Sequence, residues 1–159
     1  QFDSAFNPDT QALSEEDRAY LNQRFYSPEP RVKFARAAAH LLHSAIDISD
    51  GLAGDLGHVL EASGCGAIIE TVSLPFATAL SKVANPAECL AAALYGGDDY
   101  ELCLTVARES SQELEAIAAQ LELNITCIGE ITDNPALLLR QDSGKLEPVL
   151  AHSYAHFQA

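Results

Sequence analysis

Residues 45–57 read Ala-Ile-Asp-Ile-Ser-Asp-Gly-Leu-Ala-Gly-Asp-Leu-Gly, and this stretch decides how the rest of the chain is interpreted. A short apolar run ends on Asp47, and Ser49 and Asp50 follow before a glycine-containing segment of helical character. The pattern predicts a strand that leads into a helix. Open α/β sheets bind ligands beyond the carboxyl ends of their strands, so the three polar side chains are candidate ligand contacts.

These three residue types favour a magnesium-bound phosphate. Mg²⁺ takes carboxylate oxygens such as those of Asp47 and Asp50, and the amides of a helix N-terminus take phosphate oxygens. The Ser49 hydroxyl can donate to a phosphate oxygen. A structural alternative stays open, in which Ser49 caps the following helix and Asp50 lies in its first turn. Asp47 counts against it, because a carboxylate that ends an apolar strand needs a partner.

Two further segments carry candidate chemistry. Residues 96–102 read Gly-Gly-Asp-Asp-Tyr-Glu-Leu, and the glycines let the backbone approach a ligand that Asp98 or Asp99 then binds. Spacing alone favours another explanation, a helix C-cap and a tight turn that use glycine for a positive φ. Residues 153–157 read Ser-Tyr-Ala-His-Phe, whose aromatic rings either stack on a flat heterocycle or anchor the tail.

The formal net charge of −14 is concentrated after residue 43, where seventeen acidic residues face four basic ones. This balance argues against nucleic acid or an anionic membrane as partner, and it admits a phosphate ligand only with divalent cations. No P-loop is present and no apolar stretch is long enough to span a membrane.

The four cysteines lack Cys-x-x-Cys spacing, which argues against a zinc ribbon and favours a reducing cytoplasm. Cys103 and Cys127 lie in apolar runs and are expected to be buried.

Hydrophobic periodicity and breaker residues predict an alternation of helices and strands. The expected helices are residues 15–25, 31–43, 51–63, one or two within 75–95 with a break at 85–86, and 110–121. The expected strands are residues 45–48, 67–72, 100–107, 125–128, 136–139 and 146–150. A hairpin turn at 142–144 joins the last two. The fold class is therefore α/β (α+β), a mixed β-sheet flanked by helices.

Together these segments resemble the thiamine-monophosphate kinase family of the aminoimidazole-ribonucleotide synthetase superfamily, from residue 27 to the aromatic tail. The resemblance implies that residues 27–159 are the C-terminal substrate- and nucleotide-binding domain. Residues 1–26 would be a linker remnant and short helix after a missing N-terminal domain. In the family that domain holds most of the magnesium ions and forms the dimer, so the full-length enzyme is expected to be a homodimer.

The resemblance also implies an activity, the transfer of the γ-phosphoryl group of ATP to thiamine monophosphate with Mg²⁺, which gives thiamine diphosphate and ADP. Asp47 and Asp50 match family magnesium ligands, Ser49 matches an ATP contact, and Asp98 and Tyr154 match substrate-binding positions. The family usually has Glu where Asp98 stands, and Ser153 and Ala155 depart from its usual tail. The isolated chain is expected to fold but to be nearly inactive.

Two alternatives remain at this level. Another superfamily member, such as a selenophosphate synthetase, an aminoimidazole-ribonucleotide synthetase or a hydrogenase-maturation protein, would share the Asp-x-Ser-Asp-Gly element, although the loop at residues 96–102 counts against it. A non-catalytic acidic module that binds only a metal or a partner protein would belong to a different class.

Overall fold

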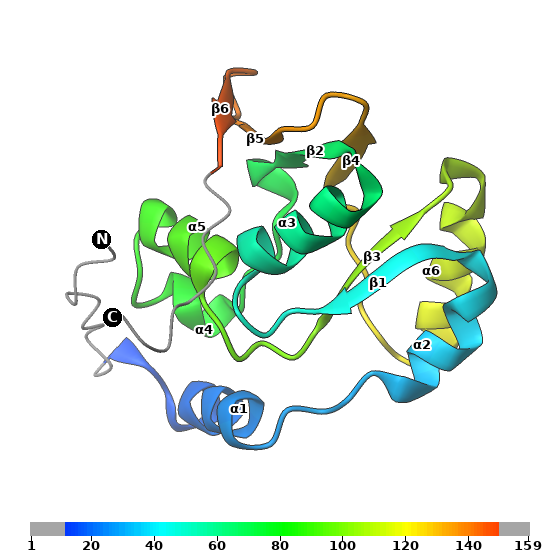
Figure 1. Cartoon of the computed structure of the whole chain (residues 1–159). Coiled ribbons are helices and arrows are strands. Elements are labelled where there is room, and N and C mark those ends of the chain that lie inside the picture. Colours follow the sequence, from blue (N-terminus) through cyan, green and yellow to red (C-terminus); the bar gives the residue numbers. More distant parts are fainter. Residues whose placement is uncertain (1–11, 150–159) are drawn as a thin grey trace, which may run out of the picture.

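The computed structural model describes residues 12–149, in which helices and strands are interleaved (Figure 1). The helices are α1 (Glu15–Tyr26), α2 (Val32–Ala38), α3 (Leu52–Ser63), α4 (Thr78–Ser81), α5 (Pro86–Tyr95) and α6 (Ser111–Gln120). The strands are β1 (Leu42–Asp47), β2 (Gly66–Glu70), β3 (Leu102–Val106), β4 (Gly129–Thr132), β5 (Leu137–Arg140) and β6 (Leu146–Pro148). The predicted fold class, α+β with helices packed on mixed β-sheet, is confirmed.

The strands divide between two sheets rather than forming the single sheet that was expected. β1 pairs with β3 antiparallel, and the other sheet has the order β4-β2-β5-β6, in which β2 and β5 run parallel. In Figure 1 the β1–β3 ribbon crosses the middle of the molecule, with α3 on one side and α2 and α6 on the other. The β1–β3 ribbon therefore lies between two separate groups of helices.

The start of β1 corrects the predicted helix over residues 31–43. Helix α2 ends at Ala38, a single 3₁₀ turn covers residues 39–41, and β1 begins at Leu42. Leu42 is paired with Val106 of β3, and Ser44 and Thr105 join their hydroxyl groups at 2.7 Å. Pairing with a strand sixty residues away overrides the local helical pattern, as strand formation depends on tertiary neighbours.

Two expectations near β4 were also wrong. The strand runs over Gly129–Thr132 and not over residues 125–128, because its register with β2 pairs Gly129 with Ile69. A Cβ atom at Gly129 would lie 2.0 Å from the carbonyl oxygen of Ile68, so this register needs glycine. Cys127 is exposed rather than buried, since it precedes the strand.

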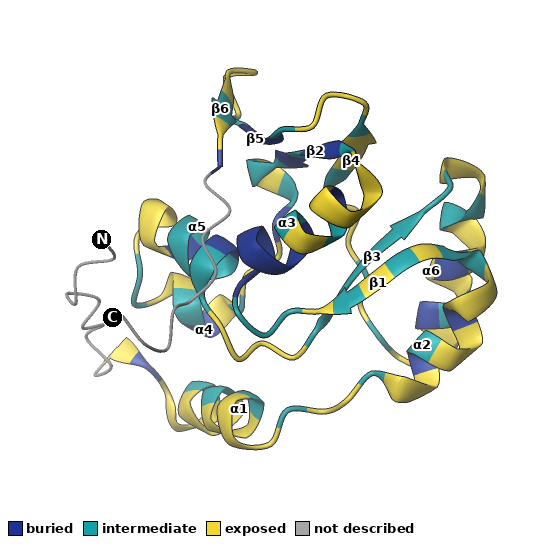
Figure 2. Ribbon diagram, in the orientation of Figure 1, coloured by how far each residue is buried: buried dark blue, intermediate teal, exposed yellow. Residues whose placement is uncertain are grey.

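Two apolar cores stabilise the structure, and Figure 2 shows them as the dark faces of α3 and of α2 and α6. The larger lies between α3 and the four-stranded sheet, and its buried members are Leu52, Ala53, Leu56, Leu60, Ala67, Ile69, Leu74, Leu94, Leu137, Leu139 and Val149. The smaller joins α2 to α6 through Phe34, Ala38, Leu114 and Ala118. No helix within residues 12–149 has the length and apolar character needed to cross a bilayer.

Helix α1 differs from the others because it carries no buried residue. Ser14 and Asp17 form a reciprocal capping box at its start. The Lys82 ammonium also binds Asp17 at 2.7 Å, and these hydrogen bonds lower the pKa of Asp17 to about 2. Polar contacts rather than core packing therefore attach this helix.

Helix α5 precedes the 96–102 loop and begins at a second capping box. The Asn85 side chain accepts from the amides of Ala87 and Glu88, both at 3.0 Å, and the Glu88 carboxylate accepts from the Asn85 amide. We expect Asn85→Ala to lower the free energy of unfolding by about 1 kcal/mol. Urea titration with Asp142→Asn as an exposed control checks this, and equal midpoints for the two variants would contradict it.

Candidate functional site

The two acidic motifs lie side by side, joined by backbone hydrogen bonds that extend the β1–β3 pairing. The Ile48 amide donates to the Glu101 carbonyl at 2.8 Å, and the Tyr100 amide donates back to the Ile48 carbonyl at 2.8 Å. The Asp98 amide donates to the Ser49 carbonyl at 2.9 Å. The turn after β1 and the loop before β3 thus form one surface, although some fifty residues separate them in the sequence.

Glycine permits this contact by close approach. A Cβ atom at Gly97 would lie 2.8 Å from the Ser49 carbonyl oxygen. Gly96 does end α5, but with φ −69°, so the expected glycine turn of positive φ is wrong. The left-handed residues of the loop are instead Asp98 at φ 66° and Tyr100 at φ 50°. Non-glycine residues in this conformation are strained and need surrounding contacts to hold them.

A buried carboxylate on α3 binds the turn after β1. Asp55, 4% exposed, accepts hydrogen bonds from the Ser49 amide at 2.9 Å and the Asp50 amide at 3.0 Å through the same oxygen, Oδ2. Helix α3 begins at Leu52 with Gly51 at the N-cap and no side-chain cap. The alternative in which Ser49 caps the helix and Asp50 occupies its first turn is therefore wrong, and both residues precede the helix.

Three of the predicted site carboxylates affect the pKa of one phenol, that of Tyr100. The Tyr100 hydroxyl donates to Asp98 Oδ1 at 3.1 Å. This hydrogen bond and the charge of Asp98 raise the pKa of Tyr100, and loss of hydration and the charges of Asp47 and Asp50 add to the rise. Asp47 is exposed at the end of β1 and needs no buried partner, so the desolvation argument made for it from the sequence does not apply. The arrangement concentrates negative charge on one exposed surface.

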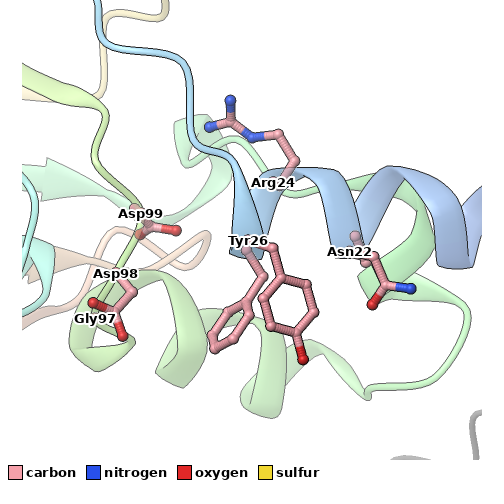
Figure 3. A pocket seen from close by; sticks show the side chains of 8 residues that line it. Asn22, Arg24, Tyr26, Gly97, Asp98 and Asp99 are labelled. Atoms are coloured by element: carbon pink, nitrogen blue, oxygen red, sulfur yellow. The ribbon is translucent and has the colours of Figure 1, made fainter.

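Two hollows flank the loop at residues 97–100. One, of about 420 Å³, lies between the loop and the end of α1 and is lined by Leu21, Asn22, Arg24, Phe25, Tyr26, Gly97, Asp98 and Asp99. Figure 3 shows the Asp99 side chain pointing toward the part of α1 that carries Arg24 and Tyr26, while the Asp98 side chain points away from that helix. Loss of hydration raises the pKa of Asp99, and the Arg24 charge opposes the rise.

The second hollow, of about 340 Å³, lies on the other side of Tyr100. Asp47, Tyr100 and Leu102 line it together with the segment that enters α2, Pro28, Pro30, Arg31, Val32 and Ala35. Its walls are mainly apolar, and Asp47 supplies an acidic edge. The predicted metal ligand Asp47 thus borders one cavity and the predicted substrate residue Asp98 borders the other.

Glu101 ties the loop to the N-terminal elements. Arg31 binds its carboxylate with two nitrogens, Nε to Oε2 at 2.9 Å and Nη2 to Oε1 at 2.8 Å, and Arg24 of α1 binds Oε1 as well. Desolvation disfavours the ionised form, but the two arginines outweigh it and hold the pKa of Glu101 below its ordinary value. This two-arginine clamp fastens α1 and the following segment to the site.

The residues present fit a magnesium ion only in part. Within residues 12–149 no three His, Cys, Asp or Glu side chains are grouped so that they could hold a metal. Asp47 and Asp50 can supply two oxygen ligands, whereas Mg²⁺ takes six and fills the remainder with waters and substrate phosphates. The described part of the chain therefore offers an incomplete ligand set.

The structure brings together four of the residues predicted for the site, Asp47, Ser49, Asp50 and Asp98, and their roles stay predictions. Tyr154 lies outside the described residues. Sequence reasoning missed the supporting side chains of the site, which are Asp55, Glu101, Arg24 and Arg31. Asp55 stands inside the stretch quoted first, and a carboxylate one turn into a helix whose N-cap is glycine is the signal that could have identified it.

Comparison with known proteins finds relatives of this chain. The chain is 42% identical to the thiamine-monophosphate kinase of Escherichia coli K12 over 150 residues, which cover 92% of the chain and 45% of the relative. It is 38% identical to that of Bacillus subtilis over 116 residues, 72% of the chain and 35% of the relative. The chain thus spans less than half the length of these relatives.

Solved structures share the fold. Thiamine-monophosphate kinase from Stenotrophomonas maltophilia superposes with a TM-score of 0.76 at 36% identity, over 80% of this chain and 40% of that one. AaThiL, complexed with AMPPCP and TMP, superposes with a TM-score of 0.72 at 27% identity, over 91% of this chain and 43% of that one. The family model described as AIR synthase related protein, C-terminal domain, matches residues 10–140. The chain therefore belongs to the family of C-terminal domains of AIR synthase related proteins.

Proposed function

We propose that this chain is the C-terminal part of an ATP- and magnesium-dependent kinase that phosphorylates thiamine monophosphate to thiamine diphosphate. The observation that supports this most is the contact between the 47–50 turn and the 97–101 loop, in a chain 42% identical to a thiamine-monophosphate kinase. One solved relative is complexed with AMPPCP and TMP, a nucleotide analogue and a second ligand. The division of the chain at residue 26 stays a prediction.

In this proposal each predicted residue has one task. Asp47 and Asp50 bind magnesium, and the Ser49 hydroxyl donates to a phosphate oxygen of ATP. Asp98, held by the Tyr100 hydroxyl at 3.1 Å, contacts thiamine monophosphate. Tyr154 shapes the same substrate site. Magnesium, when bound, neutralises phosphate charge, and phosphoryl transfer then depends mainly on the positions of the two substrates.

Charge explains why cations are needed. ATP and thiamine monophosphate are anions, and this chain has a formal net charge of −14. A polyanion will bind among Asp47, Asp50 and Asp98 only when divalent cations intervene. Since Asp47 and Asp50 leave most of an octahedral shell open, we propose that the N-terminal domain of the same enzyme provides further ligands and, as in the family, the homodimer contact. The free thiols of all four cysteines fit a cytoplasmic location.

Metal binding by the chain itself is the first test. We expect Mn²⁺ alone, used as a paramagnetic substitute for Mg²⁺, to broaden the amide signals of residues 47–50 before those of any other exposed acidic segment. Asp50→Asn should weaken this binding about tenfold, the effect of losing one charged ligand contact. Asp133→Asn, an exposed change between β4 and β5, serves as the control. Equal Mn²⁺ affinity in the two variants would contradict the assignment of Asp50.

Turnover is the second test. We expect the chain alone to release almost no ADP from ATP in the presence of Mg²⁺ and thiamine monophosphate, while thiamine monophosphate still shifts the amide signals of residues 97–100. Full turnover by the chain alone would disprove the incomplete-site proposal. Absence of any response to Mn²⁺ and thiamine monophosphate would disprove the binding roles proposed for the described residues.

A further inference from the structure

Asp55 is the buried charged side chain of the described part of the molecule, residues 12–149. It lies on α3, one turn inside the helix, and is 4% exposed. Removing a carboxylate from water is unfavourable unless hydrogen bonds compensate for the lost hydration. The proposed function assigns no ligand to this side chain, so its burial needs another explanation.

Two backbone hydrogen bonds that Asp55 accepts explain its burial. Asp55 Oδ2 receives the N–H groups of Ser49 at 2.9 Å and Asp50 at 3.0 Å. Neither amide belongs to α3, whose N-cap is Gly51. Glycine has no side chain with which to cap, so the carboxylate from within the helix reaches back over the N-cap and binds the preceding turn.

Ser49 is held at both of its backbone groups. Its N–H donates to Asp55, and its carbonyl oxygen accepts from the Asp98 amide at 2.9 Å. A displacement of the Ser49 peptide would therefore move the turn that carries Asp47 and Asp50, and it would also loosen the loop that carries Asp98. One buried carboxylate supports both halves of the site.

We infer that Asp55 is a positioning residue, which sets the turn that presents Asp47, Ser49 and Asp50 and, through Ser49, the loop that presents Asp98. The inference rests on the proposed function, because the turn is assigned there to magnesium and ATP. Asp55 itself binds neither. Its Oδ2 atom accepts two backbone hydrogen bonds at once, which favours a single turn geometry.

The decisive variant is Asp55→Asn, which keeps the size of the side chain and one carbonyl oxygen but loses the charge. We expect the amide hydrogens of Ser49 and Asp50 to exchange about tenfold faster, a change equivalent to about 1.4 kcal/mol, within the range for a charged hydrogen bond. Mn²⁺ affinity at residues 47–50 should fall several-fold. Asp55→Ala should enlarge both effects, and if it does not fold, Asp55→Asn decides alone.

Two controls separate positioning from stability. Glu61→Gln alters an exposed carboxylate on the same helix and should change neither measurement. Leu60→Ala removes a buried contact of α3, and it should lower the thermal midpoint while leaving Mn²⁺ affinity at its wild-type value. If Leu60→Ala and Asp55→Asn reduced Mn²⁺ affinity equally, general destabilisation would account for the result and the inference would fail.

The failure of the inference is distinguishable from that of the proposed function. Wild-type exchange rates at Ser49 and Asp50 in Asp55→Asn would overturn the positioning role, whatever the metal does. Failure of the unaltered chain to bind Mn²⁺ at residues 47–50 would count against the metal assignment, and the exchange rates would still decide whether Asp55 sets the turn.

Discussion

Gly51→Ala should lower the free energy of unfolding by about 3 kcal/mol, because the substitution meets two obstacles at once. Gly51 has φ 102° and ψ 145°, a conformation that side-chain-bearing residues rarely adopt. A Cβ atom there would also lie 3.0 Å from the Cα and carbonyl carbon of Tyr95, backbone atoms at the end of α5. Urea unfolding measures the loss.

Gly64→Ala is the matched control for this prediction. Gly64 ends the same helix at φ 66°, and a Cβ atom there would have no heavy atom within 4 Å. It should show the conformational penalty alone, about 1 kcal/mol. Equal losses for the two variants would mean that α5 can move away from Gly51 freely, and the close packing of the turn after β1 would then carry no energetic weight.

Glu101→Gln should destabilise the protein by about 1–2 kcal/mol at neutral pH. The variant removes the carboxylate that Arg24 and Arg31 share, and Arg31 keeps its 3.2 Å contact with the exposed Glu29. Hydrogen bonds between charged groups contribute about 1.5–3 kcal/mol each. The lower figure applies because the Glu101 side chain is 38% exposed and partly screened by solvent. Glu147→Gln removes the partner of the exposed Lys145, and no measurable change is expected from it.

The difference between wild type and Glu101→Gln should depend on pH. The pKa of Glu101 is lower in the folded protein than its ordinary 4.5, so the folded state favours the ionised form. The stabilisation is therefore fully present above about pH 4.5 and is lost as the pH falls through the folded-state pKa. Urea titrations from pH 7 to pH 3 should show the two proteins converging. A constant difference across this range would contradict the clamp.

Elements with local signals could be predicted from the sequence. Asn85-Pro86 begins α5, Gly64 ends α3, and Ser14 caps α1 as expected. Strand limits failed at Leu42 and Gly129, where pairing with a distant strand decided them. Local spacing specifies caps and turns, whereas strand register depends on residues that only the fold brings near.

The same distinction holds for the site. Asp47, Ser49, Asp50 and Asp98 stand in recognisable motifs. Their residue types and spacing identify them as candidate site residues. The Arg31–Glu101 contact joins residues seventy positions apart, and no periodicity predicts it. Sequence patterns for a helix start predict a cap from the residue before the helix, and Asp55 lies inside the helix. The supporting contacts of the site either join distant residues or, as with Asp55, run from a helix back to residues that precede it. Sequence patterns therefore reveal them poorly.

Helix α1 is attached by Lys82 to Asp17 near its beginning and by Arg24 to Glu101 near its end, without a residue in either core. It also forms one wall of the 420 Å³ hollow. Electrolyte screens such exposed charge pairs, and segments with few apolar contacts open locally long before the molecule unfolds. We therefore expect α1 to be released from the hollow in a larger fraction of molecules as the ionic strength rises.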